Sequence, residues 1–289
     1  ALPIYYLKRR IKMGLRIATN VASEFVQKNL KKVSQSAEES LNKLSSGKRI
    51  TKASDDAAGL AIAQTLKSET KSVRMATQNA NNAISVVQTA EGGLGEISNI
   101  MTRLRELTIQ SASDTVSDNE RGFIDKEYQQ LLQEQDRIAQ TTEFSGINLL
   151  NGEGPAEMDF QVGIKGSETS RITFDSSEAN ASADNLGVSG TSVETKEDAR
   201  ASIENLDEAM NSVSGYRATL GSVQSRLQSS ISNLETTAAN QEATRSKIED
   251  VDVALESSKL ASAQVVKAAG ISTLSQANNI PSSAIRLIG

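Results

Sequence analysis

Residues 66–104, LKSETKSVRMATQNANNAISVVQTAEGGLGEISNIMTRL, decide the fold of this chain. Apolar side chains return every seven residues along the stretch, and a second apolar set follows three residues behind the first. The first set is Leu66, Val73, Ala80, Val87, Leu94 and Met101, and the second is Ala76, Ala83, Ala90, Ile97 and Leu104. This heptad pattern predicts a coiled-coil helix whose alanines let a neighbouring helix approach closely. Three glycines at 92, 93 and 95 are expected to weaken the middle of that helix.

A matching stripe near the other end of the chain predicts the partner of this helix. Its apolar residues follow alternating steps of three and four, interrupted at Arg217 and Gln224. They are Ile203, Leu206, Met210, Val213, Leu220, Leu227, Ile231 and Leu234. The same frame reaches Ile248 and Leu255, which predicts one return helix of roughly 80 residues, far beyond the usual globular length. Half of that length spans roughly 60 Å, so we expect an elongated molecule.

Three shorter signals place the other helices and their ends. Residues 26–44 carry a single apolar stripe that should stop near Gly47, where glycine can adopt the left-handed turn of a helix end. The short polar side chains of residues 54–56 favour the start of the next helix. Ser117 and Glu120 have the spacing of a capping box, which predicts a third helix along Ile124, Tyr128, Leu131 and Ile138.

The middle of the chain is rich in turn-forming residues. Two short alternating runs, 158–162 and 171–174, predict a small β-hairpin with its turn at 163–170. The alternative is a disordered loop, which the composition favours for residues 176–198. The predicted fold is therefore mainly α: an elongated antiparallel helical bundle or coiled coil with a small β-hairpin region.

Composition excludes several classes of enzyme. The 289 residues include no Cys, His or Trp, so a thiol nucleophile, a Ser-His-Asp triad and a zinc site of the usual kind are excluded. No set of reactive residues converges, and we expect no catalytic, cofactor or metal site. No run approaches the ~20 apolar residues that span a bilayer. The first twelve residues place an apolar stretch before a basic cluster, the reverse of a secretory signal, which leaves a cytoplasmic protein or one exported by another route.

The two chain ends share a charge pattern that differs from the rest. Residues 1–23 contain five basic and no acidic residues, and residues 257–289 are also free of acids, whereas the whole chain has a net charge of -5. Both ends are sparsely amphipathic, so we expect them to pair with each other and to order against copies of themselves. The residues predicted to pack in this terminal unit are Ile17, Val21, Leu30, Leu274, Ile280 and Ile285.

Several long motifs resemble bacterial flagellins, the subunits of the flagellar filament. The most specific is LNKLSSGKRITKASDDAAGLAIA at residues 41–63. The resemblance continues through NANNAISVVQTAEGGLGEI (79–97), RLRELTIQSAS (103–113), FSGINLLNG (144–152), FQVG (160–163), YRATLGSVQSRLQSSISNL (216–234) and ATRSKIEDVDVALESSKL (243–260). It covers nearly everything from Gly14 to Leu287.

The resemblance implies a domain organisation. Residues 1–12 precede Met13, where the family usually starts, and are either an upstream extension absent from the mature protein, the interpretation we prefer, or an addition that faces the filament core. Residues 13–55 and 251–289 would form the two halves of an inner core domain with its connecting spoke. Residues 56–150 and 196–250 would form the surrounding helical rod, and 151–195 the short hairpin region, because the outer domains of many family members are absent.

It also implies function and partners. The chain would polymerise with itself into an extracellular filament for swimming, after export without a cleaved signal peptide. Expected partners are a chaperone on the carboxyl-terminal helix, the flagellar type III export apparatus, and the filament cap and hook-junction proteins, with no nucleic acid and no membrane insertion. The competing hypotheses are a hook-filament junction protein and a closed coiled-coil tether or signalling rod.

One surface constellation is implied by the resemblance to flagellins that Toll-like receptor 5 recognises. It is an arginine and a leucine on one helix with a glutamate on the next, which Arg103, Leu107 and Glu134 match here. Residues four apart share a helical face. The alternative is that these side chains contact a neighbouring subunit.

Overall fold

The computed structural model describes residues 19–155, 157–175 and 179–288, with side chains described as far as residue 280. Its contacts divide the chain into two units, which are considered separately. Unit 1 combines the residues up to Thr65 with those from Ala243 onward, and unit 2 extends from Leu66 to Glu242. The predicted extension 1–12 and Ile17 lie outside the described residues.

Unit 2 is built on long helices whose seam is the heptad stripe. Helix α2 (Ala57–Ser111) runs through Gly92, Gly93 and Gly95 without a break, and α4 (Lys196–Glu249) is the return helix. Nearly all of the predicted seam is buried: Val73, Ala80, Val87, Leu94, Leu206, Val213, Leu220 and Leu227 are at most 1% exposed. Leu66 and Leu234 are half-buried. The periodicity therefore identifies the core of this unit, and the seam residues near its ends are less buried than those in the middle.

Helix α3 (Asp118–Thr141) follows the predicted capping box. The Ser117 backbone N–H donates to the Glu120 carboxylate at 2.8 Å, and the Glu120 backbone N–H donates back to the Ser117 hydroxyl at 3.5 Å. Arg121, one turn on, is buried and donates to the carbonyl oxygens of Ser111, Ser113 and Val116. This guanidinium closes the carboxyl-terminal end of α2, where carbonyl groups lack helical partners.

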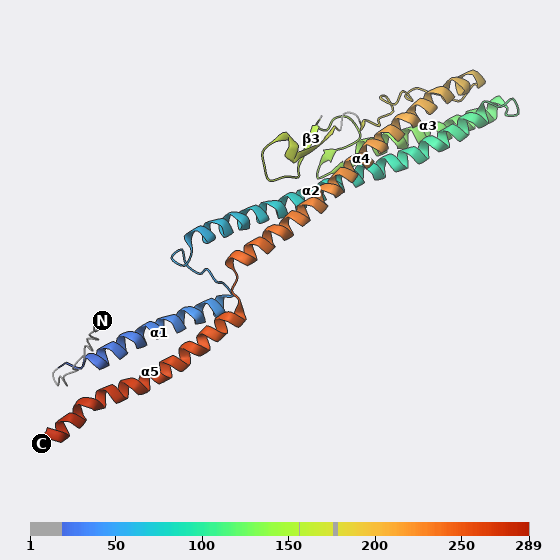
Figure 1. Ribbon diagram of the computed structural model, residues 1–289. Helices are drawn as coiled ribbons and strands as arrows, with labels where there is room; N and C mark the ends of the chain where they lie inside the picture. Colours follow the sequence, from blue (N-terminus) through green and yellow to red (C-terminus); the bar gives the residue numbers. More distant parts are fainter. Residues whose placement is uncertain (1–18, 156, 176–178, 289) are drawn as a thin grey trace, which may run out of the picture. The chain divides into compact units, whose positions relative to one another are not determined.

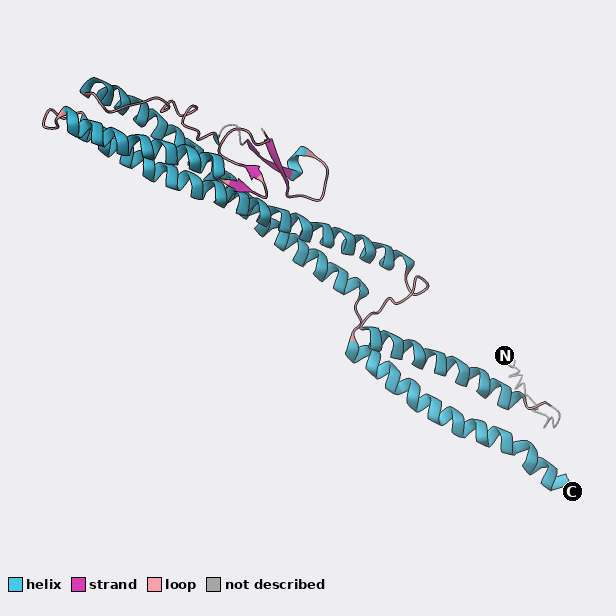
Figure 2. Cartoon of the chain, turned by 180° about the vertical axis from the view of Figure 1, so that it is seen from behind, coloured by secondary structure: helices cyan, strands magenta, loops and turns pink. Residues whose placement is uncertain are grey.

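The predicted hairpin is confirmed, and a second, smaller one precedes it. Strands β3 (Glu157–Gln161) and β4 (Arg171–Asp175) pair antiparallel, with a 3-10 turn η1 (Glu168–Ser170) between them. Figure 2 shows this hairpin beside the helices of unit 2, and its Ile172 and Phe174 join the hydrophobic core there. Strands β1 (Glu143–Phe144) and β2 (Ile147–Asn148) turn through Ser145 and Gly146, both with positive φ, the geometry of a tight hairpin turn.

The loop after the hairpin packs on the helices, so the prediction of disorder is wrong for its described part. Between 179 and 195 the side chains of Ala181, Leu186, Val188 and Val193 are buried. The Asp125 carboxylate accepts from the Val193 backbone N–H at 2.9 Å, and the Ser111 hydroxyl donates to the Val193 carbonyl at 2.6 Å. Spaced apolar residues anchor a segment whose average composition is polar.

Unit 1 contains α1 (Val21–Ser46) and α5 (Val253–Ile288), which lie side by side (Figure 1). Helix α1 ends at Gly47, whose φ of 69° is the predicted left-handed end. The prediction of one return helix of about 80 residues is wrong, because residues 250–252 separate α4 from α5. The Val251 N–H donates to the Gly47 carbonyl instead of to a helical one, and the Asp252 carboxylate then caps the first free N–H groups of α5.

Candidate assembly surfaces

The helix pair α1–α5 has almost no apolar core within one chain. Among its described side chains the buried ones are Ser23, Ser40, Glu256 and Ala277. Large apolar side chains stay exposed on both helices instead: Val21, Phe25, Leu41, Val253, Leu255, Val265, Val266, Ile271 and Ile280. Exposed apolar side chains in this number favour an interaction site, since two helices that bury so little are marginal alone.

The residues predicted to pack in this unit divide accordingly. Leu30 and Leu274 are half-buried. Val21 and Ile280 are exposed, so the described residues do not cover them. The side chain of Ile285, like Ile17, lies outside what the structure describes. For these residues, packing against another copy stays a prediction.

Polar contacts hold α1 and α5 in register. The Asn20 side-chain amide donates to the Ala277 carbonyl at 2.8 Å, and the Ser23 hydroxyl donates to the Asn278 side-chain oxygen at 2.8 Å. Twenty residues along α1, roughly 30 Å at 1.5 Å per residue, the Ser40 hydroxyl donates to the Glu256 carboxylate at 2.7 Å. Buried polar pairs of this kind can specify the register of two helices.

The Glu256 carboxylate is the charged member of this set. It is 5% exposed and also accepts from the Lys259 ammonium at 3.0 Å. The Ser40 hydroxyl, then Lys259, hold the pKa of Glu256 below its ordinary value, and Lys43 on α1 adds a smaller attraction. Because a lowered pKa stabilises the folded form only while the group is ionised, this contact weakens in acid.

We predict that acid loosens the α1–α5 pair through Glu256. The contribution is complete above the ordinary glutamate value of 4.5 and is lost as the pH falls through the lower pKa of the folded chain. Amide hydrogen exchange of α1 and α5, compared at pH 7 and pH 3 after correction for intrinsic rates, should show the loosening in the wild type. The loosening should be smaller in Glu256→Gln. Glu39→Gln, on an exposed position of α1, is the matched control, and equal acid sensitivity in all three proteins would contradict the prediction.

A second buried carboxylate, that of Glu249, connects the segment after α1 to the end of α4. Glu249 is 6% exposed, forms an ion pair with Lys48, and accepts from Arg245 at 2.9 Å. Its backbone carbonyl accepts from the Arg49 N–H at 2.7 Å. The Lys48 ammonium, then Arg245, lower the pKa of Glu249. The segments 47–50 and 248–251 are therefore held together both by backbone hydrogen bonds and by an ion pair.

Two hollows lie in the groove between α1 and α5. They have volumes of about 380 and 360 Å³ and share Val33 and Val266. Phe25, Val26 and Leu30 line one, and Leu255 with small residues such as Ser262 and Ala263 line the other. The small residues permit another helix to approach closely.

Of the predicted receptor constellation, the structure leaves Arg103 and Glu134 accessible and buries Leu107. Leu107 is 2% exposed and belongs to the core, so its prediction as a surface contact is wrong. Arg103 is exposed and pairs with Glu127 at 2.8 Å and Glu106 at 3.0 Å. Glu134 pairs with Arg137 at 2.6 Å. Glu134 lies seven residues after Glu127 on α3, which is about 10 Å along the helix. A spacing of four residues places two side chains on only approximately the same face of a helix. Here Arg103 is exposed and Leu107 is buried.

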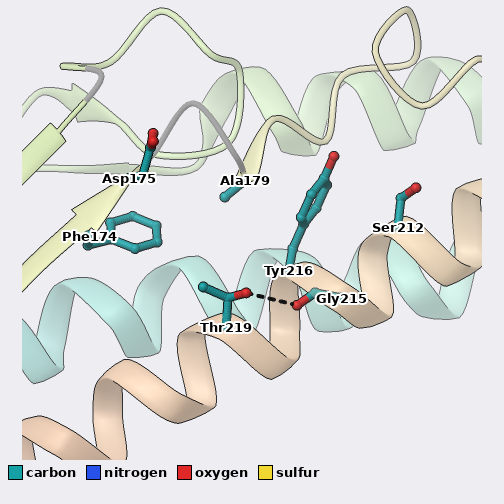
Figure 3. A pocket seen from close by; sticks show the side chains of 7 residues that line it. All are labelled: Phe174, Asp175, Ala179, Ser212, Gly215, Tyr216 and Thr219. Atoms are coloured by element: carbon teal, nitrogen blue, oxygen red, sulfur yellow. Dashed lines mark hydrogen bonds between the residues drawn. The ribbon is translucent and has the colours of Figure 1, made fainter.

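Another hollow of about 400 Å³ lies in unit 2 between β4 and α4 (Figure 3). Its lining is Phe174, Asp175, Ala179, Ser212, Gly215, Tyr216 and Thr219. The Tyr216 ring stands away from α4 into this space, and the Thr219 hydroxyl donates to the Gly215 carbonyl at 3.2 Å. The lining gathers no set of reactive groups.

The described residues also bear on membranes and metals. None of their helices is long and apolar enough to cross a membrane. Over the same part of the chain, no three acidic side chains come together in a way that could hold a metal ion.

Comparison with known proteins assigns the family. The bacterial flagellin N-terminal helical region matches residues 17–154, and the bacterial flagellin C-terminal helical region matches residues 203–288. The chain belongs to the bacterial flagellin family. Among its relatives, a flagellin of Halalkalibacterium halodurans is 34% identical over 87% of this chain and 91% of that protein. A flagellar filament 33 kDa core protein of Treponema phagedenis is 34% identical over 93% and 98%.

A solved structure agrees with this fold. The putative flagellar hook-associated protein from Vibrio parahaemolyticus has a TM-score of 0.57 and covers 68% of this chain and all of that one, at 16% identity. This similarity concerns the fold alone. Flagellins are structural proteins.

Sequence reasoning missed the polar residues that position the assembly surfaces. Ser40 and Glu256 are 216 residues apart in sequence, and no periodicity connects them. Glu249 and its partner Arg245 stand in the ATRSKIEDVDVALESSKL motif, yet the other basic partner, Lys48, lies in the turn after α1, far away in sequence. The one available signal was Asp252 beside Asp250, a helix-start pattern that argued against an uninterrupted helix.

Proposed function

We propose that this chain is the subunit of a bacterial flagellar filament and that unit 1 orders fully when copies assemble. The single observation that carries the assembly mechanism is the set of exposed apolar side chains on α1 and α5, which the described residues leave uncovered. Unit 2 keeps its own core along the α2–α4 seam and can stay folded before assembly. The relatives that are named as flagellar filament core proteins support the same function.

The polymer must grow through unlike surfaces. A contact between two different patches need not close, so repeating it generates an open helical filament. The apolar groove between α1 and α5 on one copy would receive helices of its neighbours. The filament would convert rotation at its base into thrust for swimming, and small shifts between subunit contacts would set its supercoil.

The remaining partners are proposed from the family resemblance. They are an export chaperone on the carboxyl-terminal helix, the flagellar type III export apparatus, and the filament cap and hook-junction proteins. The chaperone fits α5, because its exposed apolar residues need cover before assembly. Recognition by Toll-like receptor 5 is proposed without a contact at Leu107.

Seeded growth tests the proposed function. The purified chain, mixed with short filament seeds in precipitating salt and viewed by negative-stain electron microscopy, should extend the seeds into long uniform fibres. Discrete rods of fixed length beside unextended seeds would overturn the proposal and favour a junction protein or a closed coiled coil.

We predict that Val266→Glu abolishes seed extension. Val266 is exposed and lines both hollows of the α1–α5 groove, so a carboxylate there would have to be buried without a partner in the assembled state. Val266→Leu keeps the apolar character and should extend seeds at a rate near that of the wild type. The urea unfolding of unit 2 should be the same in both variants, and normal growth of Val266→Glu would show that this groove stays open in the filament.

A further inference from the structure

A groove on unit 2 is lined in part by exposed apolar and basic side chains. It has a volume of about 470 Å³ and lies between α2 and the turn of the β3–β4 hairpin. Met75 is 57% exposed and Ile164 is 45% exposed, and both line it. Lys71 and Lys165 also line it, and none of its described lining residues is acidic. The groove therefore suits an apolar side chain that carries carboxylates beside it.

The hairpin turn that forms one wall is held in place. The Gln161 side-chain amide donates to the carbonyls of Gly163 at 2.7 Å and Lys165 at 2.8 Å. The Asn79 side chain on α2 donates to the Gln161 carbonyl at 3.3 Å, which ties the turn to the helix. A preorganised groove loses less conformational entropy when it binds a partner than a mobile loop would lose.

One segment of the chain has the complementary chemistry. In residues 250–255, Val253 is 59% exposed and Leu255 is 57% exposed, and the acidic residues Asp250 and Asp252 accompany them. The sequence contains no basic residue from 248 to 258. Of the two basic residues that lie across from it at the junction, Lys48 is paired with Glu249 and Arg49 donates to the Ile248 carbonyl. The segment consists of the turn 250–252 between α4 and α5 and the first residues of α5, so Val253 and Leu255 lie at a helix start next to the break.

Other exposed apolar residues match the groove less well. Phe123 on α3 has the Lys126 ammonium 5.7 Å from its ring centre, which would bring a like charge to the two lysines. Val265 and Val266 adjoin Lys267 with no acid nearby in sequence, and Leu41 has Glu38 and Glu39 on one side but Lys43 on the other. Charge complementarity therefore favours the 250–255 segment.

We propose that the groove of one copy, lined by Lys71, Met75, Ile164 and Lys165, receives residues 250–255 of a second copy. The inference rests on the proposed function and adds one specific contact to it. The groove belongs to unit 2 and the segment to unit 1, so the two surfaces are unlike and the contact can repeat without closing. Complementary charges would accelerate encounter and exclude wrong registers.

Charge reversal with rescue tests this contact in the full chain. Lys165→Glu and Asp250→Lys should each slow seed extension at low salt by about tenfold, because each places like charges opposite one another. The double variant restores an opposite pair at every such contact and should extend seeds within about threefold of the wild type. Lys126→Glu, an exposed lysine of unit 2 outside the groove, is the matched control and should extend seeds normally.

A covalent readout makes the test direct. A carbodiimide should join the Lys165 amine to the Asp250 carboxylate as an amide, taking up the water that is released, and mass spectrometry should find the joined peptide in fibres and not in free subunits. Normal growth of both single variants, no rescue in the double variant, or no joined peptide in fibres would each overturn the proposed contact. Failure of the wild-type chain to extend seeds is a different result, which overturns the proposed function itself.

Discussion

Truncation of Leu94 to alanine is expected to lower the free energy of unfolding of unit 2 by about 2–5 kcal/mol. Leu94 is fully buried on the α2 seam and belongs to the hydrophobic core that α2, α3, α4 and the hairpin share. The variant loses the transfer free energy of the removed carbons and leaves a cavity that rigid neighbouring helices can close only partly. Urea unfolding of the isolated subunit, followed by circular dichroism, measures the change.

Ile109→Ala is the control for this prediction. Ile109 lies on the same helix and also loses carbon atoms, but it is exposed in the single chain. A surface substitution of this kind is expected to change the free energy of unfolding by no more than about 0.5 kcal/mol. Similar losses in the two variants would show that the heptad stripe does not carry the stability of unit 2.

The seam could be predicted because its cause is local and repeated. Once α2 forms, residues seven apart must share one face, and that face must be covered if it is apolar. Val73 and Leu220 are therefore buried as expected. Leu66 and Leu234 obey the same periodicity but are only half-buried, because they lie near the ends of unit 2.

Features that depend on contacts distant in sequence could not be predicted. The break at 250–252 depends on backbone pairing with 47–50, which competes with helical hydrogen bonds. The 179–195 loop is ordered by Asp125 and Ser111, which lie on other segments. Disorder was predicted from the average composition of this loop, which is polar and does not reveal the few apolar residues that anchor it.

The assembly surfaces were only partly predictable. Charge and sparse amphipathicity indicated that the two ends pair, and α1 and α5 do lie together. They did not reveal that buried Ser23 and Ser40 and the Glu256 carboxylate hold the pair while the large apolar residues face outward. A pattern of apolar residues indicates a face that must be covered, but it does not say whether the same chain or another copy covers it.

The three central glycines of α2 can be used to separate two effects of glycine: its low helix propensity and the close packing that it permits. We predict that Gly95→Ala raises the free energy of unfolding of unit 2 by about 1 kcal/mol, since a Cβ there meets open space and alanine favours the helix. At Gly93 a Cβ would lie 2.7 Å from the Thr142 hydroxyl and 2.8 Å from a methyl carbon of Leu150. Leu150 is fully buried and Thr142 bonds to the Ile138 carbonyl, so neither can move freely.

Gly93→Ala should therefore be less stable than Gly95→Ala by about 1–3 kcal/mol, the usual effect of overpacking. The comparison isolates steric strain, because both substitutions gain the same helix propensity. Urea unfolding of the two isolated variants measures it, and Gly92→Ala, where a Cβ also meets open space, should behave like Gly95→Ala. Equal stability of the three variants would mean that Thr142, just after α3, and Leu150, just after β2, do not pack closely on α2. A lower stability of Gly93→Ala alone would show that one glycine permits this close packing while its neighbours only weaken the helix.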